Sequence, residues 1–241
     1  MKTLTLDTLK LLDPVFQKND FIVIGEMHGS KENAPIMEKF MNAIIKSGRS
    51  LTVTFEWSLT DSEAKSLERY VTGGPVPEKI PDSFIDSDGR FTEEHCHLLK
   101  KIRSFNLQGK SNIKVCTFDG YGNFDDYENY LSNNLILTKH INKDLILVET
   151  GSIHARKTIY YENGLEEIPM TSILSKNFKV YFIFLKYLDG EINVEDVNVD
   201  VTLLKSQIDG PHNYFDAIIE IPKSHASEPL NDLTEIMDLL K

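Results

Sequence analysis

The chain has 241 residues, of which 41% are hydrophobic and 26% are charged, so it is long enough for one α/β domain with a sizeable core. Its formal net charge of -11 argues against a nucleic-acid-binding surface, which is basic, and leaves neutral and cationic substrates open. Only two cysteines occur, Cys96 and Cys116, which indicates a reducing compartment rather than a disulfide framework.

The sequence shows no targeting or membrane segment. The first residues lack the continuous apolar core of a signal peptide, and no run approaches the roughly 18 apolar residues of a membrane helix. We therefore expect a cytoplasmic protein without a membrane span, with secretion by a signal-less route left open. The acidic surface and an amphipathic C-terminal helix leave a dimer open as well.

Apolar runs of strand length alternate with segments of helical periodicity. Strands are predicted at 21–24, 51–55, 113–118, 145–148, 180–185 and 217–221, and helices at 4–16, 30–46, 61–71, 91–105, 127–141, 169–174 and 228–241. A further short helix is expected to start after His154, and 189–200 is predicted to form a hairpin or a loop. The alternation predicts a single α/β domain over 1–241. We expect a mainly parallel sheet of about five to seven strands, flanked by helices.

One long segment, 73–90, has no clear periodicity. It begins with Gly73-Gly74-Pro75 and continues rich in proline, aspartate and serine. Loops of this length in compact domains often cover a substrate site, so we predict a mobile, lid-like loop. The alternative is a short ordered insertion that contacts nothing of functional importance.

Two apolar strands end in the same motif, Gly-x-x-His. The first strand leads into Gly25-Glu26-Met27-His28, and a later one leads through Glu149 into Gly151-Ser152-Ile153-His154. If the chain is still extended after Gly25, the side chains of Glu26 and His28 point the same way. In parallel sheets ligands bind outside the carboxyl ends of the strands, so both motifs are expected at one site.

Other strands also end in acidic residues, and basic residues follow the second motif. The predicted site residues are Glu26, His28, Glu56, His154 and Arg156, with Asp119, Glu149 and Lys157 as additional candidates. We predict that Glu26, His28, Glu56 and His154 surround one cavity.

Histidines and carboxylates in one cleft suit two kinds of chemistry. In acid–base hydrolysis, a neutral His28 takes a proton from water and a carboxylate orients its ring. The helix that follows His28 presents its positive end, which would help to keep the imidazole neutral. Alternatively, Glu26, His28, Glu56 and His154 could bind a divalent metal such as zinc or manganese. In either case Arg156 and Lys157 could supply positive charge to an anionic intermediate.

The segment His95-Cys96-His97 has the residue types of a metal site but not the spacing. Positions i and i+2 do not share a helix face, so we do not predict a metal there.

The paired motifs resemble the erythromycin esterase, ChaN and TIKI superfamily. Gly25-Glu26-Met27-His28 and Gly151-Ser152-Ile153-His154-Ala155-Arg156-Lys157 are most similar to the ChaN-like branch, and Tyr214-Phe215-Asp216-Ala217 followed by a strand and Pro222 is similar to the superfamily's C-terminal part. The resemblance implies an α/β fold with the site at the strand ends.

The resemblance does not imply one activity, because this superfamily includes metal-independent esterases, metal-dependent proteases and haem-binding proteins. The chain lacks the large helical insertion of the esterases and the lipoprotein signal of the exported haem binders, so neither a macrolide pocket nor iron uptake carries over.

We favour a small hydrolase of an ester or amide-like bond, acting on a small-molecule or peptide substrate. His28 would be the base, Glu26 and Glu56 its orienting carboxylates, and His154 with Arg156 would stabilise charge or protonate the leaving group. The alternatives are a TIKI-like metal-dependent hydrolase or protease, and a ChaN-like protein that binds haem or another small ligand without turnover. Tyrosine is a known haem ligand. The candidates in that case are Tyr121, Tyr160 and Tyr161.

Overall fold

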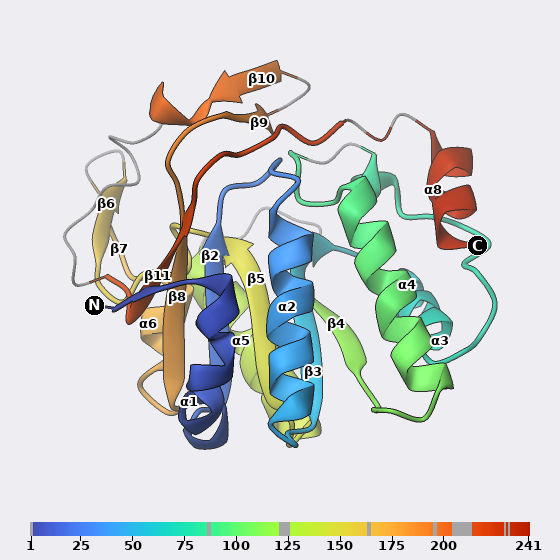
Figure 1. Ribbon diagram of the computed structural model, residues 1–241, viewed down its shortest axis with the longest axis horizontal. Coiled ribbons are helices and arrows are strands. Elements are labelled where there is room, and N and C mark those ends of the chain that lie inside the picture. Colours follow the sequence, from blue (N-terminus) through green and yellow to red (C-terminus); the bar gives the residue numbers. More distant parts are fainter. Residues whose placement is uncertain are drawn as a thin grey trace.

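The computed structural model describes residues 2–85, 88–120, 126–162, 165–194, 197–203, 214–228, 230 and 232–241. Its centre is a seven-stranded parallel sheet with the order β1-β11-β8-β2-β5-β3-β4 (Figure 1). The strands are β1 (Lys2–Leu4), β2 (Phe21–Glu26), β3 (Leu51–Ser58), β4 (Lys114–Asp119), β5 (Leu145–Gly151), β8 (Val180–Tyr187) and β11 (Ala217–Ile221). The predicted single α/β domain is confirmed.

Helices cover both faces of this sheet (Figure 1). They are α1 (Asp13–Lys18), α2 (Asn33–Lys46), α3 (Asp61–Val71), α4 (Glu93–Leu107), α5 (Tyr127–Ile141), α6 (Met170–Leu174) and α8 (Leu233–Leu240), with 3-10 turns η1 (Leu6–Leu12) and η2 (Asp82–Phe84). Two antiparallel hairpins stand apart from the sheet, β6 (Tyr160–Glu162) with β7 (Leu165–Glu167), and β9 (Glu191–Val194) with β10 (Val197–Asp200). The second hairpin confirms the prediction for 189–200. No helix in the described ranges combines the length and apolar character needed to cross a bilayer.

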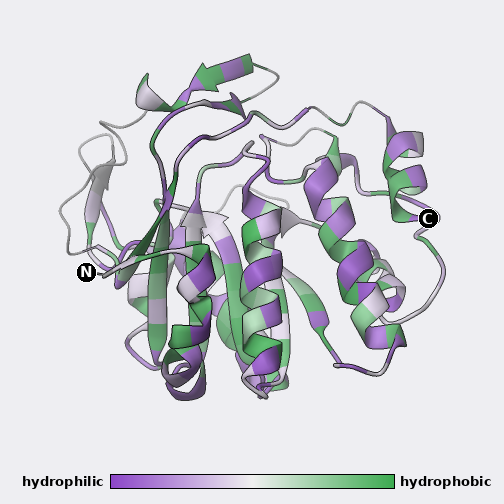
Figure 2. Ribbon diagram, in the orientation of Figure 1, coloured by the Kyte–Doolittle hydropathy of each residue, from purple (hydrophilic) through white to green (hydrophobic). Residues whose placement is uncertain are grey.

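The core consists of two layers, one on each face of the sheet. Alternate residues of each strand face opposite layers, so Ile22 and Ile24 pack toward α2 and α4, whereas Phe21 and Val23 pack toward α5 and α6. Figure 2 shows the apolar strands at the centre and helices with alternating apolar and polar faces around them. Strands covered on both faces read as continuous apolar runs, which is why β2 was recognisable in the sequence.

Three predicted helices differ from the structure. The segment 4–16 is not one helix. It contains the end of β1, which pairs with β11, and then η1 and the start of α1. The β-branched Thr3 and the extended Thr5 favour a strand there, and Pro14 starts a separate helix in its first turn. No helix forms after His154, because the amide of Lys157 donates to the carbonyl of Tyr214 rather than continuing a helical turn. The C-terminal helix predicted for 228–241 begins only at Leu233.

That later start has a local cause. Asp232 is extended, and its carboxylate accepts a hydrogen bond from the amide of Thr234, which makes Asp232 the N-cap of α8.

Sheet order places the two Gly-x-x-His segments side by side. Strands β2 and β5 are neighbours, with Gly25 opposite Thr150 and Glu26 opposite Gly151. The chain after β5 turns back over β2 so closely that a Cβ atom at Gly25 would lie 2.6 Å from the Cβ of Ala155 and 3.2 Å from the Cα of Ser152. Glycine at position 25 therefore allows the close approach that brings the second motif onto the first.

We predict that Gly25→Ala lowers the free energy of unfolding by about 1–3 kcal/mol, because the added methyl group overpacks this crossing. Denaturant unfolding followed by circular dichroism measures the change. The control is Gly48→Asn, at a turn with φ of +81° where a Cβ would meet nothing within 4 Å. Asparagine tolerates that conformation, so the control should stay within about 0.5 kcal/mol of the wild type. An equal effect of both substitutions would contradict the steric explanation.

Candidate functional site

The first motif forms a buried pair of acid and imidazole. Glu26 is 3% exposed, and its Oε1 atom contacts Nδ1 of His28. The other oxygen, Oε2, accepts a hydrogen bond from the side-chain amide of Asn33, whose own Oδ1 accepts one from the hydroxyl of Tyr187. Residues from α2 and β8 thus fix Glu26. Since Nδ1 of His28 is held by Glu26, its Nε2 is the ring nitrogen that remains for chemistry.

Glu56 lies at the centre of the site. Its position follows from an irregularity in the pairing of β3 with β4, between Phe55 and Ser58. Its Oε2 atom accepts hydrogen bonds from the hydroxyl of Thr150 at 2.5 Å and from the amide of Gly151 at 2.9 Å. Its buried Oε1 atom makes no hydrogen bond of good geometry to any residue that the structure describes. The nearest cations to Oε1 are Arg90 Nη1 at 3.1 Å and His154 Nε2 at 3.7 Å.

The second motif repeats the arrangement of the first. Nδ1 of His154 lies 2.8 Å from Oε1 of Glu128, which α5 buries to 5% exposure. Glu128 is itself fixed by the hydroxyl of Tyr160 at 3.0 Å and the amide of Met170 at 2.6 Å. Each motif histidine therefore has one nitrogen bound to a buried carboxylate, and its other nitrogen is available on the side of Glu56.

Both rings approach the same point at the end of β5. A Cβ atom at Gly151 would lie 3.3 Å from Nε2 of His28 and 3.6 Å from Cδ2 of His154. The two rings therefore lie close to each other, because both are within 3.6 Å of the same point. The structure thus brings Glu26, His28, Glu56 and His154 together at the carboxyl edge of the sheet, where the first three line one small recess and His154 lies outside its lining.

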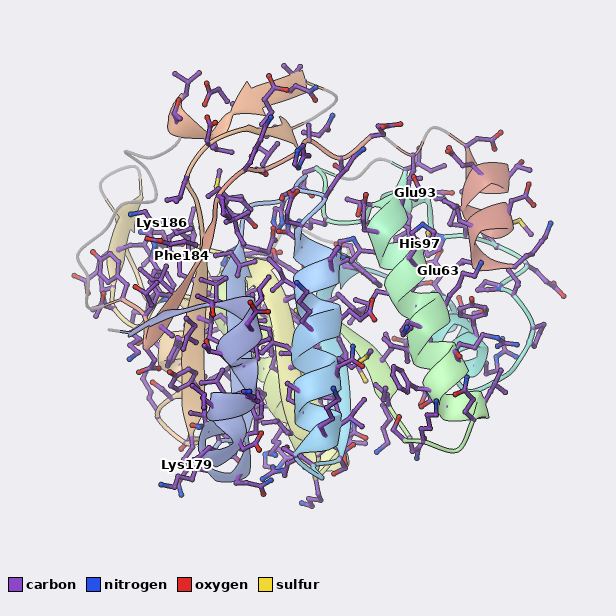
Figure 3. The ribbon with its side chains drawn as sticks, in the orientation of Figure 1. Glu63, Glu93, His97, Lys179, Phe184 and Lys186 are labelled. Carbon is purple, nitrogen blue, oxygen red and sulfur yellow. The ribbon has the colours of Figure 1, made fainter. Side chains whose placement is uncertain are left out.

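A third acid–imidazole pair involves a histidine that we did not predict as a site residue. Nδ1 of His95 accepts a hydrogen bond from the amide of Thr92 at 3.1 Å, so its proton is on Nε2, which lies 3.3 Å from both oxygens of Glu149. His95 is 1% exposed, whereas the side chain of His97 is 60% exposed and contacts Glu93 (Figure 3). The two histidines point in different directions, as their spacing predicted.

Arg90 supplies the positive charge beside Glu56. Its Nη1 atom also lies 2.9 Å from Oδ2 of Asp119, and its Nε lies 2.9 Å from Asp88. Asp119 is therefore linked to Glu56 through Arg90, and its role at the site stays a prediction.

Arg156 and Lys157 make their contacts elsewhere. The guanidinium of Arg156 lies over the rings of Tyr160 and Tyr214, at 5.6 and 5.5 Å from their centroids. Lys157 contacts Asp216 and lies over the ring of Phe182. Their predicted role in stabilising charge remains untested, but Arg90 is the arginine that reaches Glu56.

The charges of the site stabilise one another. Burial raises the pKa of Glu56, but the cationic side chains of His154, Arg90 and His28 outweigh it and bring the pKa down to about 2. Burial lowers the pKa of His28, but the carboxylates of Glu26, Glu56 and Asp88 outweigh it and raise the pKa to about 9. In the same way, Glu56 and Glu128 raise the pKa of His154 against the effect of burial.

This result corrects our expectation that a helix N-terminus keeps His28 neutral. Helix α2 begins at Asn33, beyond the loop that follows His28, and a helix dipole acts mainly within its first turn. Adjacent carboxylates have the larger effect and raise the pKa of His28, while burial raises the pKa of Glu26, so the two groups share a proton tightly.

A cavity of about 690 Å³ opens beside these residues. Its walls include Trp57, Phe84 and Phe91, together with the charged residues Asp88, Arg90 and Asp119. The predicted lid-like loop, 73–90, therefore contributes to the wall, and it also buries Ile80 and Phe84 in the core. The loop 73–90 therefore contacts both the cavity and the core. That it opens as a lid remains a prediction.

The sequence favours no cofactor and leaves a divalent metal and haem open. Among the described residues, no group of three or more histidine, cysteine, aspartate or glutamate side chains is arranged to hold a metal ion. For haem, the hydroxyl of Tyr160 donates to Glu128, the structure does not describe the side chain of Tyr161, and Tyr121 lies outside the described residues.

Comparisons with known proteins support the fold. No protein-family model and no curated protein matches the chain. A crystal structure of a protein from Bacillus cereus is similar over 95% of both chains, with a TM-score of 0.68 and 13% sequence identity. ChaN of Campylobacter jejuni, solved with cofacially bound haem, gives a TM-score of 0.38 and 14% identity over 74% of this chain and 86% of ChaN. The first likeness shows the fold alone, and the second is too low to support an argument.

We predict that His28 titrates with a midpoint near pH 9 and that Glu56→Gln lowers this midpoint, because the substitution removes a carboxylate that stabilises the imidazolium. Two-dimensional NMR of the ring signals measures the midpoint, with His28→Gln used to assign them. The raised pKa stabilises the fold below pH 6.5, and this contribution disappears as the pH rises through 9. A midpoint below 7 in the wild type would contradict the assigned electrostatics.

Proposed function

We propose that this protein is a hydrolase of an ester or amide-like bond, in which His28 is the general base. The observation that supports this proposal best is the symmetry of the site. Two imidazole–carboxylate pairs, Glu26 with His28 and Glu128 with His154, lie near Glu56, and both rings approach the end of β5.

His28 is suited to activate water. Glu26 holds Nδ1, so a water molecule would transfer its proton to Nε2, and the adjacent carboxylate would stabilise the imidazolium that forms. The raised pKa makes His28 a strong base, although only its minor neutral fraction can accept a proton at neutral pH.

His154 is suited to donate a proton, and Arg90 is suited to stabilise negative charge. The raised pKa of His154 favours its protonated form, which could donate from Nε2 to the leaving group. Arg90 could stabilise negative charge on the substrate oxygen. Glu56 would stay ionised throughout and hold both cations in place.

A panel of aryl esters and amides tests this function. We expect log kcat/KM to rise with unit slope from neutral pH toward 9, because the neutral fraction of His28 grows tenfold per pH unit below its pKa. His28→Ala should lower kcat/KM by at least about 100-fold.

The matched control is His97→Ala, at an exposed position on α4, which should leave the rate unchanged. A rate that falls between pH 7 and 9 would contradict the profile expected of a general base with a pKa near 9. Absence of turnover across the panel would favour a ligand-binding protein instead.

The two motif histidines should behave as one unit. Because each acts in the same proton transfer sequence, His28→Ala and His154→Ala should each remove most of the activity, and the double variant should lose little more than either single one. Steady-state kinetics of the four proteins measures this coupling. Additive losses in log kcat/KM would show that the histidines act independently.

Metal analysis of the same four proteins distinguishes the metal-dependent alternative. If these histidines were metal ligands, the wild type would contain stoichiometric metal, and each single variant would lose it. We expect the activity to be lost without any change in metal content.

A further inference from the structure

The reactive groups are closed off from the cavity beside them. The recess that Glu26, His28, Glu56 and Glu149 line has a volume of about 10 Å³, which is about the least that a single water needs. The adjoining cavity of about 690 Å³ is large enough for a small molecule. A substrate bound in the large cavity would reach His28 from that side if part of the wall between the two spaces moved.

Trp57 and Arg90 line both spaces. Trp57 is 3% exposed, its ring is stacked on Phe55 at a centroid distance of 4.0 Å, and its Nε1 donates to the carbonyl of Arg90 at 2.8 Å. These contacts fix the indole and the backbone of Arg90. The side chain of Arg90 is 26% exposed, so it is the part of the wall that can move.

Arg90 is held from the side of the large cavity as well as by Glu56. Its bonds to Asp88 and Asp119 lie on the side of the large cavity, which both acids line. Its contact with Oε1 of Glu56, at 3.1 Å, lacks hydrogen-bond geometry and leaves that buried oxygen without a hydrogen bond in the described structure. A small rotation toward the cavity would uncover Oε1.

The departure of Arg90 would leave a buried carboxylate short of a positive partner. Removing one partner of a buried ion pair costs several kcal/mol unless another cation replaces it. The recess contains three carboxylates, those of Glu26, Glu56 and Glu149, and the nearest other cation to Oε1 of Glu56 is His154, whose Nε2 lies 3.7 Å away. An entering group that is positively charged and rich in N–H donors would restore the closer partner that Oε1 loses.

We propose that the substrate displaces the side chain of Arg90 from Glu56. The substrate carries an amidinium or guanidinium group, which takes the place of the Arg90 guanidinium on Oε1 of Glu56. The lining of the large cavity suits a cation, because it includes the carboxylates of Asp82, Asp88 and Asp119. That this cation is a substrate rests on the proposed hydrolase function, whereas its binding does not require turnover.

Benzamidine is the probe, and isothermal titration calorimetry with the full chain measures its affinity. Arg90→Ala removes the side chain that covers Oε1 of Glu56, together with a competing positive charge. The variant should therefore bind benzamidine at least about tenfold more tightly than the wild type. Adding Glu56→Gln to Arg90→Ala should abolish the gain. Arg90→Gln, which keeps a polar side chain beside Glu56, should show a smaller gain and serves if Arg90→Ala does not fold.

Two controls separate displacement from simpler effects. Lys79→Ala removes the same charge from the rim of the large cavity, where Lys79 approaches Asp82 at 3.9 Å, and should change the affinity less than about twofold. Benzamide has a similar shape without the charge and should gain nothing in the Arg90 variants.

Unchanged or weaker benzamidine binding in both Arg90 variants would overturn the proposal. An equal gain in Lys79→Ala, or an equal gain for benzamide, would also overturn it. Changes in the NMR signals of His28 on titration locate the ligand in the recess. Because none of these measurements needs catalysis, failure of the hydrolase proposal would be recognised separately by the absence of turnover.

Discussion

The site depends on one buried carboxylate, that of Glu56. An ionised carboxylate in a protein interior costs several kcal/mol unless donors and cations surround it. The donors are the hydroxyl of Thr150 and the amide of Gly151, which belong to the neighbouring strand β5, and the cations are His28, His154 and Arg90. The register of β3 against β5 therefore fixes the carboxylate, and the carboxylate in turn gathers the cations.

Both faces of the sheet contribute to this arrangement. Asn33 and His95 come from α2 and α4 on one face and hold Glu26 and Glu149, whereas Glu128 comes from α5 on the other face and holds His154. A site at the carboxyl edge of a parallel sheet can take partners from both layers because the strands end there. The acid–imidazole pairs are thus rigid through contacts that lie far apart in the sequence.

This division explains which residues the sequence could predict. Glu26, His28, Glu56 and His154 follow apolar strands directly, so local patterns and the rule for parallel sheets were sufficient to predict that they come together. Glu128 and His95 lie within helices, and Arg90 lies in a loop, where no local pattern distinguishes them from ordinary surface residues.

Arg156 and Lys157 were predicted from their closeness in sequence to His154, and their role at the site stays a prediction. The chain turns after His154 and bonds to Tyr214, which directs both basic side chains toward other partners. Comparing magnitudes would have prevented the error about the charge of His28. A helix dipole contributes about 0.3–1 kcal/mol. A pKa shift from 6.5 to about 9 corresponds to roughly 3 kcal/mol.

The same electrostatics link access to the site with its chemistry. Arg90 helps to keep the pKa of Glu56 low, and Glu56 helps to keep the pKa of His28 high, so a change at the wall of the recess alters the base inside it. If a neutral group displaced Arg90, Glu56 would become easier to protonate, and its support for the histidines would weaken. A cation in the same position would preserve that support. The charge of the entering group would therefore decide not only whether it binds but also whether the histidines beside it keep the pKa values that acid–base chemistry requires.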